Sequence, residues 1–370
     1  MARKAYKYRI GPTKGQQRIL NEMLEEARWT YNQTIAIRKD AWEQRQAHIG
    51  YYDTKRMLPI WKEERPSLNK VHSMVLQDVT MRVELAFQSF FRRLKENAEE
   101  AGYPRFKGKG RYDSLTYPQY GNGVKLNGKT LILSKVGTVN IHLHRPIEGT
   151  IKTVTITRSA TGKWYACLSV ELEPAYQSPT HQTIGVDVGL ETFATLSNGE
   201  KIANPRFFRR DEKDVNRAHR RLSKEQKGTP ERAKRRKVVA RIHERIANRR
   251  RDFAHQLSRK LVNRFDVIAF EDLSITRMLK NHCLAKSIAD AAWNQSIQYI
   301  SYKAAEAGRV VVLVDPRGTS QRCSSCGTVV KKELRVRVHT CPACGLTIDR
   351  DVNAAINILA LGLQSIGTNP

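Results

Sequence analysis

The segment that most constrains the fold is residues 184–196, IGVDVGLETFATL. Apolar, β-branched residues bounded by turn residues predict a buried strand, a turn and a second strand from Thr192 to Leu196. Because side chains alternate along a strand, Gly185, Asp187 and Gly189 share one face. A buried carboxylate needs a positive partner, and flanking glycines would leave room for a divalent ion carrying a phosphate. The alternative is an aspartate that caps the turn at Gly189.

Two later segments carry acids that could join Asp187. Residues 267–273, VIAFEDL, predict a second buried strand, in which Val267, Ala269 and Glu271 share one face and Ile268, Phe270 and Asp272 the other. Residues 349–361, DRDVNAAINILAL, have an apolar stripe at helical spacing, and Asp351 opens this helix. Small alanines would let the helix approach a sheet. Three carboxylates could then hold Mg²⁺ or Mn²⁺, and two such ions can activate water and stabilise the leaving oxygen of a phosphodiester.

The chain carries a large surplus of positive charge, with 65 Lys+Arg against 36 Asp+Glu and a net charge of +29 in 370 residues. This surplus predicts a polyanionic partner. The sequence contains no long apolar span or signal-like start, so nucleic acid is favoured over a membrane, and a cytoplasmic protein of two or three domains is expected. A basic protein without such a partner is the alternative.

The first third of the chain predicts a strand and two long helices. Residues 5–10 alternate as a strand does, residues 13–42 begin with a capping-box pattern, and residues 70–101 carry a second apolar stripe. These stripes are typical of the core of a helical lobe.

Residues 102–123 have a different composition, in which tyrosine and phenylalanine alternate with arginine, lysine and glycine. Cations for phosphates and rings for bases are typical of a loop that contacts single strands or RNA, and Arg105, Lys107 and Tyr112 are its candidate contacts. An ordinary surface loop is the alternative.

Four short strand-like runs come next, at residues 130–133, 138–142, 154–158 and 164–172. If the N-terminal strand joins them, they form a small β-barrel into which the helical lobe is inserted. The proline-containing residues 173–182 then predict a linker.

Residues 206–251 contain 19 Lys+Arg and 6 Asp+Glu, with sparse apolar residues at helical spacing. They predict a helical hairpin, broken near Gly228 and Pro230, that lies along a nucleic-acid backbone. Arg235, Arg236 and Lys237 are candidate phosphate contacts. A solvated helix is the alternative.

Four of the six cysteines form two CxxC pairs, CSSCG at 323–327 and CPACG at 341–345. Thiolates at this spacing can bind one structural Zn²⁺ tetrahedrally, and the following glycine permits a tight turn. Disulfides or free thiols are the alternative, although this spacing favours a metal and a reducing compartment. The predicted ligands are Cys323, Cys326, Cys341 and Cys344.

The order of the motifs GVDVGL, FEDLS, DPRGTSQRCSSCG, CPACG and DRDVNAAIN, with LAKSIADAAW between them, resembles the TnpB family. Members are transposon-encoded RNA-guided DNA endonucleases related to type V CRISPR effectors. FQSFFRRLKE and GYPRFKGKGRYDS extend the resemblance over nearly the whole chain. It implies an α/β nuclease domain of the RuvC-like, RNase H type at 183–318 and 346–370, a zinc-ribbon insertion at 319–345, a wedge-like β-barrel at 1–11 and 106–174, a helical recognition lobe at 12–105 and a linker at 175–182.

Carried over by motif, the catalytic acids are Asp187, Glu271 and Asp351, holding two Mg²⁺ or Mn²⁺ ions. The resemblance passes over their near neighbours Asp272 and Asp349. Pleat geometry alone does not choose between these neighbours and the acids that the motifs select. It further implies a guide RNA from the transposon end that pairs with double-stranded target DNA, while the protein reads only a short adjacent motif. Candidate residues for that reading are Ser73, Gln77 and Thr116.

Two other classes of function fit parts of the pattern. A nuclease-inactive, RNA-guided DNA-binding regulator would have the same charge and zinc site, but the intact acidic trio argues against it. A DNA transposase of the RNase H-like class would also use three acids and would need no guide RNA. For each of these functions we expect a prokaryotic, cytoplasmic protein that associates with the nucleoid when it binds DNA. The sequence does not determine its oligomeric state.

Overall fold

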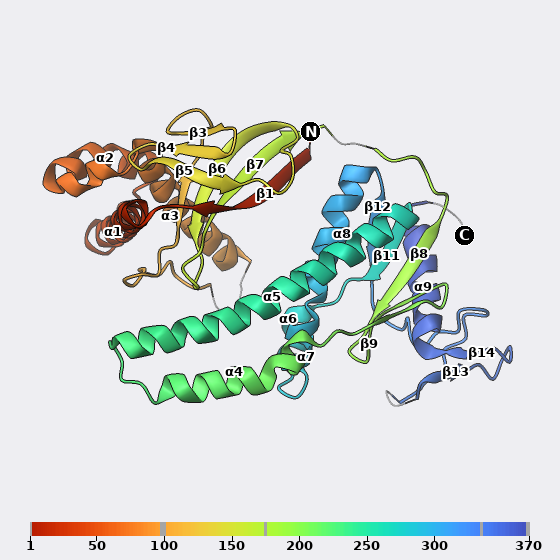
Figure 1. Ribbon diagram of the computed structural model, residues 1–370. Helices are drawn as coiled ribbons and strands as arrows, with labels where there is room; N and C mark the ends of the chain where they lie inside the picture. Colours follow the sequence, from red (N-terminus) through yellow and green to blue (C-terminus); the bar gives the residue numbers. More distant parts are fainter. Residues whose placement is uncertain (1, 97–100, 174–175, 334–335, 368–370) are drawn as a thin grey trace. The chain divides into compact units, whose positions relative to one another are not determined.

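The computed structural model describes residues 2–96, 101–173, 176–333 and 336–367. It divides into two compact units, Met1–Glu173 and Pro174–Pro370 (Figure 1). Each unit has its own apolar core. The predicted linker begins beside this division.

The first unit is built on a seven-stranded, barrel-like antiparallel sheet in the order β2-β6-β7-β1-β5-β4-β3. Strand β1 lies at its centre, between β7 and β5. The N-terminal strand therefore joins the later strands, as predicted. The strands are β1 (Ala2–Gly11), β2 (Ser114–Tyr117), β3 (Val124–Asn127), β4 (Thr130–Leu133), β5 (Gly137–His142), β6 (Thr150–Arg158) and β7 (Trp164–Leu172).

The helical lobe lies between β1 and β2 in the chain and shares one core with the sheet. Helix α1 (Lys14–Arg45) begins with the predicted capping box, in which Thr13 and Gln16 exchange hydrogen bonds of 3.0 and 3.3 Å. Helix α3 (Ser73–Lys95) is shorter at both ends than predicted; residues 97–100 lie outside the described residues. Between them, α2 (Tyr51–Glu64) and the 3-10 helix η1 (Pro66–Lys70) are not predicted by the sequence pattern.

The second unit contains a five-stranded sheet in the order β10-β9-β8-β11-β12. Strands β8, β11 and β12 are parallel, and β9 and β10 run antiparallel to their neighbours. The strand, turn and strand predicted at residues 184–196 are confirmed. The strands are β8 (Thr183–Val188), β9 (Thr192–Leu196), β10 (Lys201–Ala203), β11 (Val267–Glu271) and β12 (Val310–Val314).

Helices cover both faces of this sheet. On one face, α5 (Pro230–Arg264) and α8 (Trp293–Ala307) share a core with Val186 and Phe270; on the other, α9 (Arg350–Ser365) packs against Ala269 and Val312. Helix α4 (Phe207–Ser223) pairs with α5 as the predicted hairpin. The remaining elements are α6 (Ile275–Met278), α7 (Ala285–Ala291), β13 (Val338–Thr340) and β14 (Thr347–Asp349).

The close contact between α9 and β8 depends on Gly185. A Cβ added there would lie 2.0 Å from the carbonyl oxygen of Ala355 and 2.8 Å from the backbone nitrogen of Leu359. The interpretation that this glycine leaves room for a metal-bound phosphate is therefore wrong, because helix backbone fills the space. A Cβ added at Gly189 would likewise lie 2.9 Å from the carbonyl oxygen of Thr192, across the turn.

We predict that Gly185→Ala strongly destabilises the second unit. The methyl group would overlap helix backbone, which cannot move aside as a flexible side chain can, so the free energy of unfolding should fall by about 3 kcal/mol or more. Thermal unfolding followed by circular dichroism measures this change. Gly15→Ala, at an exposed position in the first turn of α1, is the control; equal stability of both variants would contradict the prediction.

Candidate functional site

The strands β8 and β11 bring two of the predicted acids together. Their parallel pairing runs as far as Val186 and Phe270, so Asp187 and Glu271 are the next residues on neighbouring strands. Because Val186 and Phe270 point into the core beneath α5 and α8, the two acids lie on the α9 face. Asp351 stands in the first turn of α9, which packs on that face.

Electrostatics link the three acids. Burial raises the pKa of Asp187 to about 8, and the neighbouring charges of Glu271 and Asp351 add to the effect. Burial also raises the pKa of Glu271, against the effect of a hydrogen bond from Thr319. Carboxylates that share a buried site favour bound protons or a bound cation. Such hard oxygen donors fit Mg²⁺ or Mn²⁺.

The acids that the motif comparison passes over have other surroundings. Asp349 is the N-cap of α9: its Oδ1 accepts from the backbone nitrogens of Asp351 and Val352 at 2.9 and 3.2 Å. Its Oδ2 accepts from Lys201 at 2.7 Å. Asp272 is exposed. Of these neighbouring acids, one is engaged in a helix cap and the other points to solvent.

Arginines occupy both oxygens of Asp351. Arg350 donates to Oδ1 at 3.1 Å, and Arg337 lies 3.6 Å from Oδ2 while also pairing with Glu191 at 2.5 Å. In the described part of the chain, the sulfur atoms of the four cysteines all lie within 4.8 Å of one another, whereas the oxygen atoms of these three carboxylates do not. The binding of metal by Asp187, Glu271 and Asp351 therefore stays a prediction.

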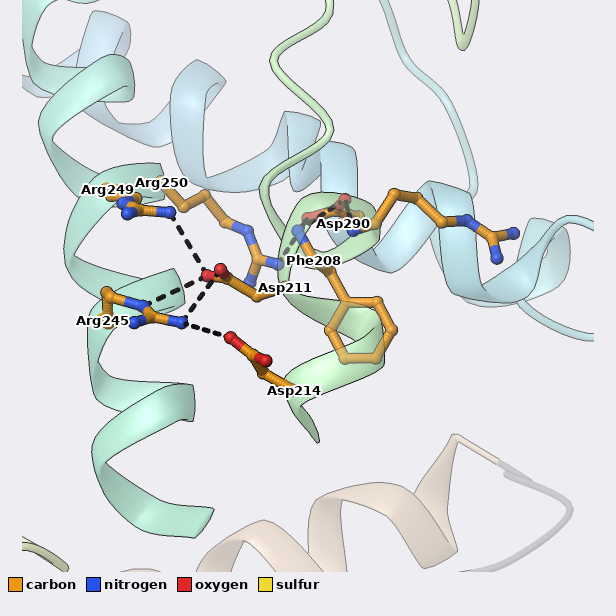
Figure 2. A network of polar contacts seen from close by, with 8 residues as sticks. Phe208, Asp211, Asp214, Arg245, Arg249, Arg250 and Asp290 are labelled. Atoms are coloured by element: carbon orange, nitrogen blue, oxygen red, sulfur yellow. Dashed lines mark hydrogen bonds and ion pairs between the residues drawn. The ribbon is translucent and has the colours of Figure 1, made fainter. Parts of the chain in front are cut away.

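Ion pairs and hydrogen bonds join the two helices of the basic hairpin to each other and to α7 (Figure 2). Asp211 on α4 accepts from Arg245 and Arg249 on α5 at 2.9 and 3.2 Å. Asp290 on α7 accepts from the backbone nitrogen of Phe208 and from Arg250, both at 2.9 Å. Part of the positive charge of the hairpin thus holds it together and is not available for phosphates.

The predicted phosphate contacts on α5 lie farther along the hairpin. Arg235, Arg236 and Lys237 are all exposed. Arg235 pairs with Glu225 at 3.3 Å, whereas the other two have no polar contact to the residues that the structure describes. Their exposure is compatible with binding a nucleic acid.

The predicted contacts in the first unit differ in their accessibility. Ser73 and Gln77 line a groove of about 530 Å³ together with Tyr52, Lys55, Arg56 and Lys62. Thr116 accepts from Arg82 at 2.5 Å and shares a 2.9 Å hydrogen bond with Thr155, so its hydroxyl is already engaged.

Parts of segment 102–123 pack against the rest of the first unit. Tyr112 is only 5% exposed and lies against Tyr31, so the expectation that its ring stacks on a base is wrong. Arg105 and Lys107 are exposed, but the backbone of Lys107 exchanges hydrogen bonds with Asn32 at 2.7 and 3.0 Å. Strand β2 occupies the middle of the segment, where its two buried residues pack into the core.

The four predicted zinc ligands converge. Their Sγ atoms all lie within 4.8 Å of one another, with 3.6 Å between Cys323 and Cys344 and 3.5 Å between Cys326 and Cys341. A tetrahedron with Zn–S bonds of about 2.3 Å has edges of about 3.8 Å. The glycine after each pair adopts a positive φ, 77° at Gly327 and 73° at Gly345. This cluster fits one zinc ion.

Comparisons with known proteins match most of the chain. Residues 167–282 match a family described as "Probable transposase", residues 293–358 match "Cas12f1-like, TNB domain", and residues 1–47 match "Helix-turn-helix domain". Residues 2–45 form β1 and the single helix α1 here.

A "Putative RNA-guided DNA endonuclease" of Streptomyces pristinaespiralis is 38% identical over 371 residues, covering 98% of this chain and 90% of the relative. The chain belongs to the TnpB family of RNA-guided DNA endonucleases. Its relatives include InsQ of Escherichia coli K12, named in the same way and 31% identical over 97% of this chain and 92% of its own length. TnpB-like protein L79 of Acanthamoeba polyphaga mimivirus is 27% identical over 60% of this chain.

Solved structures show the fold that this TnpB-family chain shares. The Cas12f1–sgRNA–target DNA complex matches with a TM-score of 0.59 at 15% identity, over 94% of this chain and 83% of that one. The mini-RNA-guided endonuclease CRISPR-Cas_phi3 matches with a TM-score of 0.56 at 9% identity, over 98% and 92%. Among the described helices, none is long and apolar enough to cross a membrane.

Several residues that contact the acids or lie near them are not indicated by the sequence motifs. Arg337 contacts Asp351 from the segment between the two cysteine pairs, and no pattern in the sequence indicates this. Thr319 donates to Glu271 at 2.5 Å. Asn353 and Asn357 are buried, and their spacing of four residues within an apolar helix was a usable signal of buried hydrogen bonds.

We predict that Asp187→Asn stabilises the chain when zinc is present and no other divalent ion is added. The folded-state pKa of Asp187, about 8, lies above its ordinary value of 3.8, so the unfolded chain loses this proton first. Wild-type stability should fall as pH rises through this interval, and the advantage of the asparagine should grow from about pH 5 to about pH 9. Thermal unfolding across this range tests it; a constant difference would contradict it.

We predict that Cys341→Ala loses zinc and lowers the unfolding temperature, because three thiolates hold a structural ion poorly and Cys341 is only 1% exposed. Elemental analysis and thermal unfolding measure the two effects. Cys283→Ala, at an exposed cysteine outside the cluster, is the control and should retain one zinc per chain. Unchanged zinc in Cys341→Ala would refute the site.

Proposed function

We propose that this TnpB-family protein is an RNA-guided endonuclease that cuts double-stranded DNA beside a short adjacent motif. The observation that carries the proposal is the half-buried acidic cluster, where partial burial and the charges of Glu271 and Asp351 raise the pKa of Asp187, within a chain similar to named RNA-guided DNA endonucleases over nearly its full length. Asp187, Glu271 and Asp351 are its proposed catalytic residues.

We assign the cluster to an RNase H-like, RuvC-type domain at 183–318 and 346–370. The support is a sheet in which the antiparallel strands β8, β9 and β10 are followed by the parallel strands β11 and β12, with α9 on one face. The zinc ribbon occupies 319–345, the wedge-like barrel 1–11 and 106–174, the recognition lobe 12–105 and the linker 175–182.

The acids would hold two Mg²⁺ or Mn²⁺ ions, which when bound lower the pKa of water and neutralise charge on a phosphodiester. The chain supplies the geometry. The strand pair fixes Asp187 beside Glu271, and the cap by Asp349 fixes the first turn of α9, which carries Asp351. Arg350 and Arg337 balance the negative charge while Asp351 binds no cation.

Basic surfaces would bind the guide RNA, which we propose to come from the transposon end, and its pairing with DNA would choose the target. The net charge of +29 supports polyanionic partners, and Arg236 and Lys237 are exposed for phosphate contact. In the first unit, the groove at Ser73 and Gln77 is the proposed reader of the adjacent motif. Action on DNA places the protein at the prokaryotic nucleoid.

A nuclease-inactive regulator and a DNA transposase are the competing functions. The regulator would retain RNA and DNA binding and show no cutting. The transposase would act without RNA. RNase treatment and an acid substitution therefore separate the three functions.

We predict that the protein purifies with RNA and that its complex cuts a matching double-stranded DNA in Mg²⁺. Asp187→Ala should leave RNA and DNA binding nearly unchanged and abolish cutting, because one carboxylate of the metal site is gone. Absorbance at 260 nm before and after RNase, filter binding and gel analysis of the DNA measure these properties, and sequencing the RNA gives the guide for the test DNA.

Cutting by Asp187→Ala at the wild-type rate would refute the acidic site. Binding without cutting by the wild-type complex would favour the regulator. DNA joining that survives RNase would favour the transposase.

A further inference from the structure

We propose that Thr319 is a positioning residue for Glu271, and that Asn353 and Asn357 tie it to the first zinc knuckle, so that zinc binding sets the geometry of the acidic site. The inference rests on the proposed function and adds to it a mechanical link between two metal sites. It concerns residues 319–324 and their contacts with β11 and α9.

The first step is the contact between Thr319 and Glu271. The hydroxyl donates to Oε1 at 2.5 Å, and its other neighbour, the carbonyl oxygen of Pro316, is more distant at 3.2 Å. Thr319 is 4% exposed. A hydroxyl has one proton, so the shorter contact defines its orientation. With Oε1 engaged, the second oxygen of Glu271 remains for a cation.

The second step fixes the backbone that carries Thr319. Asn357 donates from Nδ2 to the carbonyl oxygens of Thr319 and Arg322 at 2.8 and 2.7 Å. Because Asn357 is only 8% exposed, water has little access to its amide and cannot easily replace it as the donor. The position of Thr319 thus follows the position of α9.

The third step reaches the zinc ligands. Asn353, with no exposed surface, donates to the carbonyl of Arg322 at 2.8 Å and accepts from the backbone nitrogen of Ser324 at 2.9 Å. These contacts hold the residues on both sides of the ligand Cys323. Asn353 follows Asp351 by two residues on α9, so the knuckle is fixed to the helix turn that carries the third acid.

Together these contacts connect the knuckle to two acids on different elements. Zinc fixes Cys323, the asparagines fix residues 319–324 on α9, and the hydroxyl of Thr319 fixes Glu271 on β11. A threonine that only closed its own turn would need no bond to Glu271. A group that orients a metal ligand usually changes metal affinity when it is removed.

The test measures Mn²⁺ binding to the zinc-loaded full chain by electron paramagnetic resonance, with Asp187→Ala as the baseline for the acidic site. Thr319→Val keeps the shape of the side chain and replaces the hydroxyl with a methyl group. Thr319→Ala removes the hydroxyl and adds no methyl group in its place. We expect both to keep one zinc per chain and to bind Mn²⁺ about tenfold more weakly than wild type. Thr319→Ser should restore affinity, and Thr347→Val, exposed on β14, should leave it unchanged.

A second arm needs no variant. Removing zinc from the wild-type chain and titrating Mn²⁺ should show the same loss of affinity, and adding zinc back should reverse it.

Wild-type affinity for Mn²⁺ in both Thr319→Val and Thr319→Ala would overturn the inference and leave the proposed function intact. Equal affinity with and without zinc would overturn the link to the zinc knuckle. If wild type binds no more Mn²⁺ than Asp187→Ala, the proposed acidic site itself fails, and this inference fails with it.

Discussion

The contact of α9 backbone with the glycine face of β8 is the constraint on which the candidate site depends. At Gly185 the helix lies so close that even one added carbon would overlap a carbonyl oxygen. Asp187 is two residues farther along the same face of β8, and Asp351 is one helical turn before Ala355. The distance between these acids is therefore set by backbone packing more than by the flexible ends of their side chains.

This packing creates an electrostatic conflict that the rest of the site resolves. Burial and neighbouring carboxylates disfavour the ionised form of Asp187, and the chain offers counter-charge nearby from Arg350. Arg337 adds a second contact to Asp351 from the zinc-binding segment. A carboxyl group whose pKa is raised by its surroundings in this way is typical of a functional site. The cysteine cluster is different: its four thiols form a closed set that fits one zinc ion.

Much of the fold could be predicted because periodicity and spacing are local signals. The strands β8 and β11, the capping box at Thr13 and the two CxxC pairs are all encoded within short windows. The burial of Tyr112 could not be predicted, because a ring among glycines and cations has the same local pattern whether it packs on Tyr31 or faces solvent. The reason for Gly185 was equally hidden, since it lies in a helix 170 residues away in the chain.

Strand β12 and helix α9 pack together although the whole zinc-binding segment separates them in the chain. β8 and β11 are likewise neighbours across the long α4–α5 hairpin. Contacts between residues so far apart in sequence form late, since each must first overcome the entropy of closing a large loop. We therefore expect the acids to assemble only in the last stage of folding, after the local hairpins have formed. A partly folded chain, with its basic helices already present, would bind nucleic acid before it could cut any.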